Sequence, residues 1–235
     1  MSNEFVLENL KIYSDESELL NCDTFTIPLK STTLFLSDNS QTLQYLIKAI
    51  GGIRIPDSGN IYLGGYNVFD INNNVENIIK KRISYVFENG ALISNLNIEQ
   101  NLILTLDFHF PKESYDKKIR RIKAFLQDFE LDIDINLRPY QLKIEQIKLL
   151  GFIRALLSEP DIIIYDEPFR YTDSNTKKLI IRKLNELKAN LITQIIKTQF
   201  NEDFVRHCDL IYYIKAGKLV FSGSIKDFID SQTDY

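Results

Sequence analysis

The spacing of apolar residues divides the chain into a strand-rich first part and a longer alternation of helices and strands. Through about residue 36, short apolar runs such as FVLENLKIY and TTLFL alternate with polar turns, which predicts strands. Residues 41–50 carry apolar side chains at the spacing of one helical face, and Gly51-Gly52 supplies a stop signal after them. The first part therefore predicts strands that lead into an amphipathic helix.

The rest of the chain alternates in the manner of an α/β fold. Residues 97–130 are polar and helix-rich, with Pro111 dividing them, and residues 141–157 predict a further helix before a strand at Ile162. The residues that this further helix is expected to turn inward are Ile144, Ile147, Leu150, Ile153, Leu156 and Leu157. Beyond the strand we expect a helix over 174–189, a strand over 191–197, a short helix, and a strand over 209–214. This order predicts a parallel sheet.

The segment IIIYDEPF, from Ile162 to Phe169, carries the clearest candidate chemistry. Its four apolar residues read as a buried parallel strand that ends in Asp166 and Glu167. Ligands of open α/β folds bind at the carboxyl ends of such strands. We therefore expect the two carboxylates to lie at a binding site.

Composition restricts the class of protein only broadly. At 235 residues, 44% of them apolar, the chain can bury a sizeable core. A formal charge of −4 gives no signal for nucleic acid, and the basic residues between 112 and 123 are interleaved with acidic ones, as on a solvated helix face. The first residues show no signal-peptide pattern, and no apolar run is long enough to cross a bilayer.

Cysteine and histidine usage suggests neither a disulfide framework nor a metal site. Cys22 and Cys208 are two isolated cysteines, which we expect to be small core residues in a reducing compartment. His109 and His207 have no metal-ligand spacing around them. The motifs GxSxG, CxxC and HExxH do not occur, so other catalytic classes have no support.

Three segments together resemble the ATP-binding subunits of ABC transporters. They are IIIYDEPF, IRIPDSGNIYLGG (residues 53–65) and ISYVFENGALISNLNIEQNL (residues 83–102). The combination of NGAL with YDEPF is most similar to the ATPase subunit of Mla-type, Mce-associated phospholipid transporters. The resemblance implies a P-loop NTPase-like nucleotide-binding domain over residues 1–235, with a parallel core sheet, an antiparallel β subdomain and a helical subdomain at about 97–157. It also implies Mg-ATP as cofactor, with Asp166 at the magnesium position and Glu167 at that of the general base.

The phosphate loop of this family lacks its usual chemistry here. The motif GxxxxGK[ST] uses glycines to wrap the phosphates, a lysine for their charge and a hydroxyl for magnesium. The corresponding register runs from Ser37 to Gln44 and contains, as degenerate nucleotide-binding positions, Ser37, Asn39, Ser40, Thr42, Leu43 and Gln44. Leu43 stands in place of the lysine and Gln44 in place of the hydroxyl. Thr42, at a glycine position, resists the positive φ that such a turn often needs.

The signature segment, which in this family caps a helix and contacts the γ-phosphate on the opposite subunit, is altered as well. Its register is LKIEQ, with Lys143, Ile144, Glu145 and Gln146 as the degenerate nucleotide-binding positions. Ile144 blocks close backbone approach, and Glu145 adds a negative charge beside a phosphate. We therefore expect an ordinary start of an amphipathic helix here rather than a repurposed phosphate contact.

Three further positions complete the comparison with the family. Glu88 replaces the Q-loop glutamine and can still ligate magnesium. Gln199 replaces the switch histidine and cannot carry a proton at neutral pH. Asp173 keeps the aspartate of the D-loop. The candidate catalytic positions are thus Glu167, Gln199 and Asp173, and the candidate magnesium positions are Asp166 and Glu88.

The resemblance leads to one hypothesis and two alternatives. Because both halves of the composite ATP site are altered, we expect an ATPase-type fold with little or no hydrolysis. It would dock as a subunit of a phospholipid transporter onto an integral membrane permease and a second ATP-binding subunit, identical or not, and would lie peripherally at the cytoplasmic face of the inner membrane. One alternative is an active ATPase in which Lys143 or another basic residue replaces the missing lysine. The other is a soluble regulator derived from such an ATPase.

Overall fold

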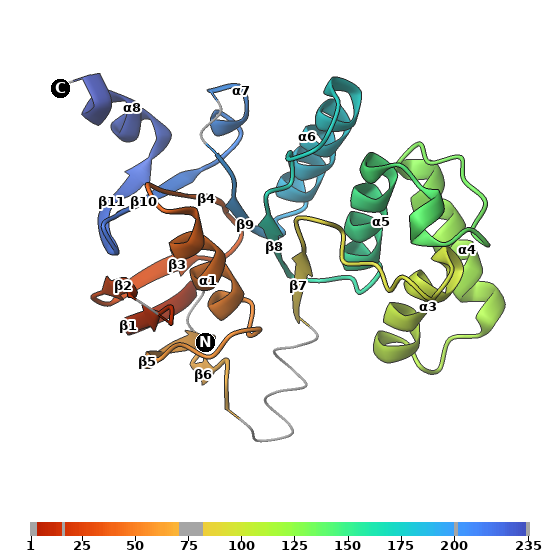
Figure 1. Ribbon diagram of the computed structural model, residues 1–235, viewed down its shortest axis with the longest axis horizontal. Coiled ribbons are helices and arrows are strands. Elements are labelled where there is room, and N and C mark those ends of the chain that lie inside the picture. The colour runs from red at the N-terminus through yellow and green to blue at the C-terminus, as the bar shows by residue number, and fades with distance from the viewer. Residues whose placement is uncertain (1–3, 16, 71–81, 200–201, 234–235) are drawn as a thin grey trace.

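The computed structural model describes residues 4–15, 17–70, 82–199 and 202–233. In Figure 1 two sheets lie to the left with a helix between them, and the helical part of the chain lies to the right. This arrangement confirms the predicted α/β fold with a parallel sheet, an antiparallel sheet and a helical part.

The elements follow the predicted alternation. The strands are β1 (Glu4–Tyr13), β2 (Glu18–Cys22), β3 (Phe25–Pro28), β4 (Thr32–Ser37), β5 (Ser58–Leu63), β6 (Tyr66–Asn67), β7 (Ile83–Val86), β8 (Ile162–Asp166), β9 (Thr193–Lys197), β10 (Leu210–Lys215) and β11 (Lys218–Ser224). The helices are α1 (Ser40–Ile50), α3 (Ile98–His109), α4 (Tyr115–Asp128), the 3-10 turn η1 (Pro139–Gln141), α5 (Ile144–Leu156), α6 (Ser174–Ala189), α7 (Glu202–Val205) and α8 (Ile225–Thr233).

The larger sheet has the order β11-β10-β4-β9-β8-β7. Its strands pair in parallel from β10 to β7, and β11 adds an antiparallel edge. Every residue of β8 and β9 is buried, which explains the apolar run of β8 and means that the polar residues of β9 need partners within the protein. Because carboxyl ends of parallel strands share one edge, the ends of β4, β8 and β9 bring Ser37, Asp166 and Lys197 to the same edge of the sheet.

The smaller sheet covers α1. It is antiparallel, with the order β2-β1-β5-β6 and with β3 paired to the other end of β1. The apolar face of α1 packs between the two sheets in one core, to which Phe5, Phe35, Leu46 and Ile164 belong. This sandwich fixes the amino terminus of α1 beside the edge of the parallel sheet.

The helical part packs through a second core against the face of the larger sheet that is turned away from α1. As predicted, a break around Pro111 separates α3 from α4. The helix expected from residue 141 begins instead at Ile144, after the 3-10 turn. As the first residue of this helix, Ile144 is exposed rather than turned inward. The strand expected from Leu191 begins at Thr193, because Leu191 is exposed and has a φ of 59° in the turn after α6.

Both cysteines lie in the core, as expected. Burial raises the pKa of the Cys22 thiol to about 11 and that of Cys208 to about 12, so both are protonated at neutral pH.

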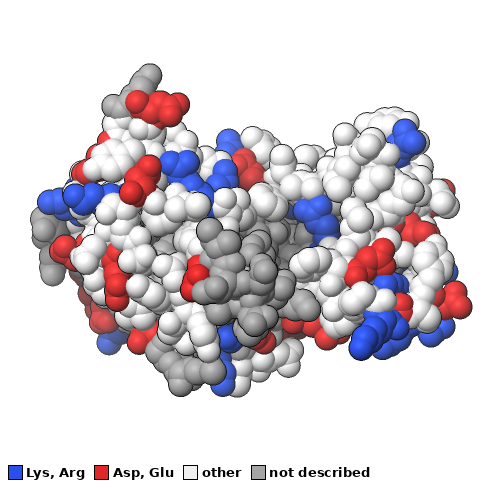
Figure 2. All heavy atoms as spheres, turned by 90° about the horizontal axis from the view of Figure 1, so that it is seen from below, with Lys and Arg blue, Asp and Glu red and all other residues white. Residues whose placement is uncertain are grey.

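Figure 2 shows basic and acidic residues interspersed on the face seen there, including its right side over the helical part. No helix within the described ranges has the length and apolar character needed to span a membrane.

Candidate functional site

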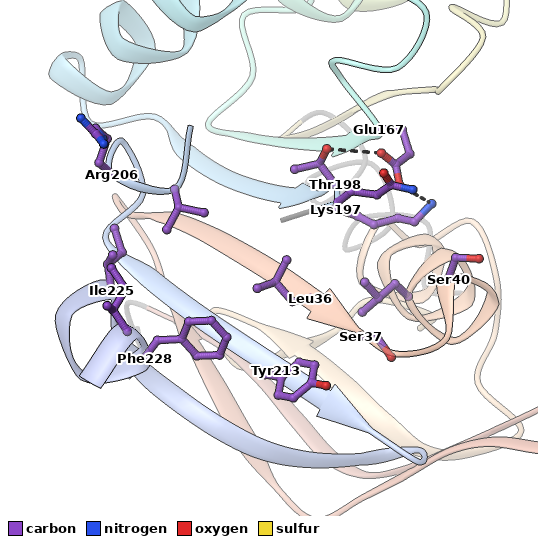
Figure 3. A pocket seen from close by; sticks show the side chains of 14 residues that line it. Leu36, Ser37, Ser40, Glu167, Lys197, Thr198, Arg206, Tyr213, Ile225 and Phe228 are labelled. Atoms are coloured by element: carbon purple, nitrogen blue, oxygen red, sulfur yellow. Dashed lines mark hydrogen bonds and ion pairs between the residues drawn. The ribbon is translucent and has the colours of Figure 1, made fainter. Parts of the chain in front are cut away.

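A cavity of about 780 Å³ opens at the carboxyl edge of the parallel sheet. Figure 3 shows Lys197, Glu167 and Thr198 together at one end, and Arg206 with aromatic and aliphatic side chains from β10 and α8 at the other end. The residues that line it are Leu36, Ser37, Ser40, Leu43, Glu167, Lys197, Thr198, Gln199, Val205, Arg206, Tyr213, Ile225, Phe228 and Ile229. The cavity therefore joins the predicted phosphate loop, the general-base position and the switch position.

The loop before α1 is closed by its own side chains. Asn39 caps the helix, since its Oδ1 accepts hydrogen bonds from the backbone N–H groups of Gln41 at 2.9 Å and Thr42 at 3.4 Å. The Ser37 hydroxyl donates to Asp38 and accepts from the Asn39 N–H. Three backbone N–H groups of the loop are thus already bonded to its own side chains, and Asp38 adds a negative charge.

Thr42 and Leu43 both serve the packing of α1. The Thr42 hydroxyl donates to the Leu19 carbonyl oxygen at 3.1 Å, and the residue lies in the first turn of the helix. The expected conflict with a positive φ therefore does not arise. Leu43 is buried in the core between the two sheets and also lines the cavity, while Gln44 does not line it. The lysine position of the loop is thus an apolar wall.

Lys197, at the end of β9, is the cationic group of the cavity that lies beside the two carboxylates. Its Nζ lies 2.9 Å from Asp166 Oδ1 and 3.5 Å from Glu167 Oε1. The three side chains are 6%, 4% and 10% exposed, so they form a buried cluster of two carboxylates and one ammonium. Asp166 Oδ2 also accepts a 3.3 Å hydrogen bond from Tyr85, whose pKa is raised by burial and by that carboxylate. The negative charges of Asp166 and Glu167, the predicted magnesium and general-base positions, are therefore balanced in part by a lysine of the same chain.

Glu167 is held by contacts on every side. Its φ of 52° lies in the left-handed region, which is unusual for a residue other than glycine. Its backbone N–H donates to the Lys197 carbonyl at 2.8 Å, and the Thr198 hydroxyl donates to its Oε2 at 3.3 Å. The Lys148 ammonium, from α5, donates to the Glu167 carbonyl at 2.5 Å and to the Arg170 carbonyl at 2.8 Å. These bonds keep the strained turn after β8 in place.

Lys148 gives this turn a pH dependence. Burial lowers the pKa of its ammonium to about 8, against the opposing effects of Glu88, Glu167 and Asp166. Because this pKa is lower than that of an unfolded lysine, the unfolded chain binds more protons between about pH 8 and pH 10. Over that window we expect the unfolding free energy of the native chain to rise relative to that of Lys148→Met, by at most about 1.4 kcal/mol per pH unit. Urea unfolding of both chains measures this difference, and parallel pH profiles would contradict it.

The remaining predicted catalytic and magnesium positions are less closely associated with the cavity. Glu88 is paired with Arg170 at 2.8 Å and does not line the cavity. Gln199 lines it and is exposed. Asp173 is an exposed helix cap whose carboxylate accepts from the Thr176 N–H at 2.7 Å, and this bond, together with the nearby Lys143, lowers its pKa. The structure thus places Gln199 on the same cavity as Glu167, and Glu88 and Asp173 in other contacts.

The four signature positions lie at the start of α5, outside the lining of the cavity. Gln146 Oε1 accepts the Lys143 backbone N–H at 3.0 Å, which is the side-chain half of a helix cap. The side chain of Ile144, the first residue of α5, is exposed. The arrangement is that of an ordinary helix start, and any phosphate contact from it would have to reach a second subunit.

The residues at this site do not fit Mg-ATP as the resemblance implies it. The phosphate loop offers a leucine and an engaged helix cap, and Lys197 occupies the two carboxylates on which a divalent cation would depend. In the described part of the chain there is no cluster of three or more His, Cys, Asp or Glu side chains suited to holding a metal ion. The site can stabilise its own charges, but the groups that hold a triphosphate are missing.

Lys197 and Lys148 were not singled out from the sequence. A lysine directly after the apolar residues of a buried strand is the signal for Lys197, because a charge in that position needs partners on neighbouring strands. The partner became visible only with the strand order, which sets Asp166 and Lys197 opposite each other in register. For Lys148 the signal is weaker, since its partners are backbone carbonyls.

Comparison with known proteins gives consistent results. Residues 44–170, more than half of the chain, match the family model described as ABC transporter. An Fe(3+) ions import ATP-binding protein of Haemophilus influenzae is 27% identical over 216 residues, which are 91% of this chain but only 60% of that protein. A lipoprotein-releasing system ATP-binding protein of Buchnera aphidicola is 21% identical over 226 residues, covering 93% of this chain and 98% of that protein.

Solved structures show the same fold. A dimeric ATP-binding cassette, in a post-hydrolysis state bound to ADP and phosphate, superimposes with a TM-score of 0.84 at 21% identity. The superposition covers 94% of this chain and 98% of that one.

Proposed function

This chain belongs to the ABC transporter family, and from that premise we propose that it is a transporter subunit that docks onto a membrane permease without appreciable ATP hydrolysis. The observation that supports this most directly is the buried cluster in which Lys197 pairs with Asp166 and Glu167. A carboxylate that is paired with an ammonium and accepts a threonine hydroxyl is a weaker general base for an attacking water. In addition, the capped phosphate loop is expected not to hold the triphosphate of ATP in a reactive position.

A partner surface is available on the helical part. Ile93, Leu104 and Phe108 are exposed apolar residues on the loop that follows β7 and on α3, around a hollow that also contains Arg154. Arg154 donates to the carbonyls of Gly90 and Ala91 and thereby fixes this loop on α5. A rigid, partly apolar hollow suits the side chains of an amphipathic helix from a membrane subunit.

Replacement of Phe108 by aspartate tests this surface. Phe108 is 56% exposed, so we expect the fold to change little while binding to the permease weakens by about tenfold or more, because an anchor side chain is lost and a charge is placed in the interface. Val220→Asp is the matched control, since Val220 is 54% exposed on the edge strand β11. Co-expression with the membrane subunit and measurement of the co-purified ratio decide the question. Equal loss in both variants would contradict the assignment of this surface.

ATP turnover tests the proposed function as a whole. The purified chain, alone and with its permease, is expected to release phosphate at the background rate, and Glu167→Gln is expected to leave that rate unchanged. Substantial activity that disappears in Glu167→Gln would overturn the proposal. That result would establish the active ATPase, for which the position of Lys197 in the cavity, beside Ser37 and Ser40, is the supporting observation.

We propose that the cargo of the transporter is phospholipid. This proposal rests on the motif NGAL at residues 89–92 together with YDEPF at 165–169. The names of the relatives instead refer to iron import and lipoprotein release. Purification of the intact complex followed by analysis of its bound lipids distinguishes these cargoes.

The remaining proposals concern assembly. We propose that residues 1–235 act as one domain, with 97–157 as its helical insert, and that the chain pairs with a second ATP-binding subunit at the cytoplasmic face of the inner membrane. Mass measurement of the complex shows whether the pair is identical or mixed.

A further inference from the structure

We propose that the Lys197 ammonium is a built-in counterion that replaces the divalent cation of this site, so that the native chain binds no Mg²⁺ or Mn²⁺ at Asp166 and Glu167. The biological role of this counterion rests on the proposed function, because a docking subunit without ATP turnover needs a site that is stable without nucleotide and metal. Its physical basis is independent of that function and lies in the contacts of three side chains.

The ammonium occupies the oxygens that a metal ion would require. Lys197 Nζ contacts Asp166 Oδ1 and Glu167 Oε1, while the second oxygen of each carboxylate accepts a hydroxyl, from Tyr85 and Thr198 respectively. Hard divalent cations bind through such carboxylate oxygens and complete their shell with water. A cation that entered would have to displace the ammonium from both carboxylates at once.

The position of Lys197 makes that displacement unfavourable. Asp166 and Lys197 are register partners on the adjacent strands β8 and β9, so the backbone holds their side chains together. Figure 3 shows Lys197 extending from the end of β9 toward Glu167, between that residue and the helix start at Ser40. Lys197 also lines the cavity, but its side chain is only 6% exposed where it contacts the two carboxylates. Displacement of the ammonium into the cavity would cost both of its ion pairs.

The cavity provides a site for metal once the ammonium is gone. In Lys197→Met, Glu167 and Thr198 still line a cavity large enough for the water molecules of a hydrated ion, and Asp166, held by Tyr85, lies next to them at the end of β8. We therefore expect this variant to gain a metal site with a dissociation constant of about 10⁻⁴–10⁻³ M, the range of weak oxygen-ligand sites. Removal of one positive charge would convert a metal-free site into a metal-binding one.

The experiment measures Mn²⁺ binding by electron paramagnetic resonance, without nucleotide, to the native chain and to two variants. Lys183→Met is the matched control, because the Lys183 side chain is also 6% exposed and also bridges two carboxylates, Asp128 and Glu186. Those carboxylates are about half exposed, however, and remain hydrated when their lysine is lost. We expect bound Mn²⁺ only in Lys197→Met, accompanied by a rise of its melting temperature with Mn²⁺ concentration.

Each outcome decides the inference. Equal Mn²⁺ binding by the native chain and Lys197→Met would overturn it, as would equal gains in Lys197→Met and Lys183→Met. If Lys197→Met folds only in the presence of Mn²⁺, the inference is supported. If it does not fold at all, Lys197→Gln, which keeps a polar side chain without the charge, decides by the same measurement. Because nucleotide is absent, failure here is distinct from failure of the proposed function, which is measured as ATP turnover.

Discussion

Replacement of Lys197 by methionine is expected to lower the free energy of unfolding by about 3–5 kcal/mol in metal-free buffer at neutral pH. Asp166 and Glu167 are buried and pair with the same ammonium. Methionine fills a similar volume, so the loss arises mainly from two carboxylates left without a counterion. Chemical denaturation in the presence of a chelator measures the change.

Two variants show whether the loss is electrostatic. Lys183→Met is expected to reduce stability much less, by about 0–1 kcal/mol, because its two carboxylate partners are about half exposed. Adding Asp166→Asn and Glu167→Gln to Lys197→Met is expected to restore most of the lost stability, since neutral groups of similar shape replace the buried charges. A loss below about 1 kcal/mol in Lys197→Met would show that Lys197 does not compensate the carboxylates.

Leu43→Lys combined with Lys197→Met is expected to bind Mg-ATP at least about tenfold more tightly than Leu43→Lys alone. Leu43 lines the cavity together with Ser40, Lys197 and Glu167, so a lysine at position 43 would reach the same space. Added alone, it would place a second ammonium beside Lys197 and leave the carboxylates occupied. With Lys197 removed, the carboxylates become available to a metal ion and the new lysine to phosphate. A charge-assisted contact of this kind contributes about 1.5–3 kcal/mol.

Calorimetry on four chains tests this exchange. The native chain and Leu43→Lys are expected to give no heat at millimolar Mg-ATP, and Leu43→Met with Lys197→Met serves as the volume-matched control without the new charge. Binding in Leu43→Lys that equals that of the double variant would show that Lys197 is not the obstacle. Micromolar binding by the native chain would show that Leu43 and the capped helix start do tolerate a triphosphate.

The sequence predicted the fold from patterns that are local. The buried run from Ile162 to Tyr165, with its two terminal carboxylates, has the periodicity of a central parallel strand, and Pro111 locates the break between α3 and α4. Two boundaries differ from the structure by two or three residues, because the 3-10 turn before α5 and the turn at Leu191 depend on backbone geometry that apolar spacing does not encode.

The site was predicted only as far as its residues lie close together along the chain. Leu43 and Gln44 stand out against the spacing of the phosphate loop, but the cap by Asn39 depends on where the helix begins. Lys197 lies 31 residues after Asp166, and their contact requires β9 to lie between β4 and β8. Strand order is a property of the whole fold, so the central contact of the site could not be derived from spacing alone.

The pairing of Asp166 with Lys197 across neighbouring strands also limits how this site can change by single substitutions. Loss of the lysine first gives a destabilised chain, and gain of a lysine at position 43 first gives a cavity crowded with like charges. Neither intermediate is expected to bind nucleotide as the double variant does. The two substitutions are therefore strongly epistatic. Because of the buried ion pair, nucleotide binding is expected to be regained only when both positions change together.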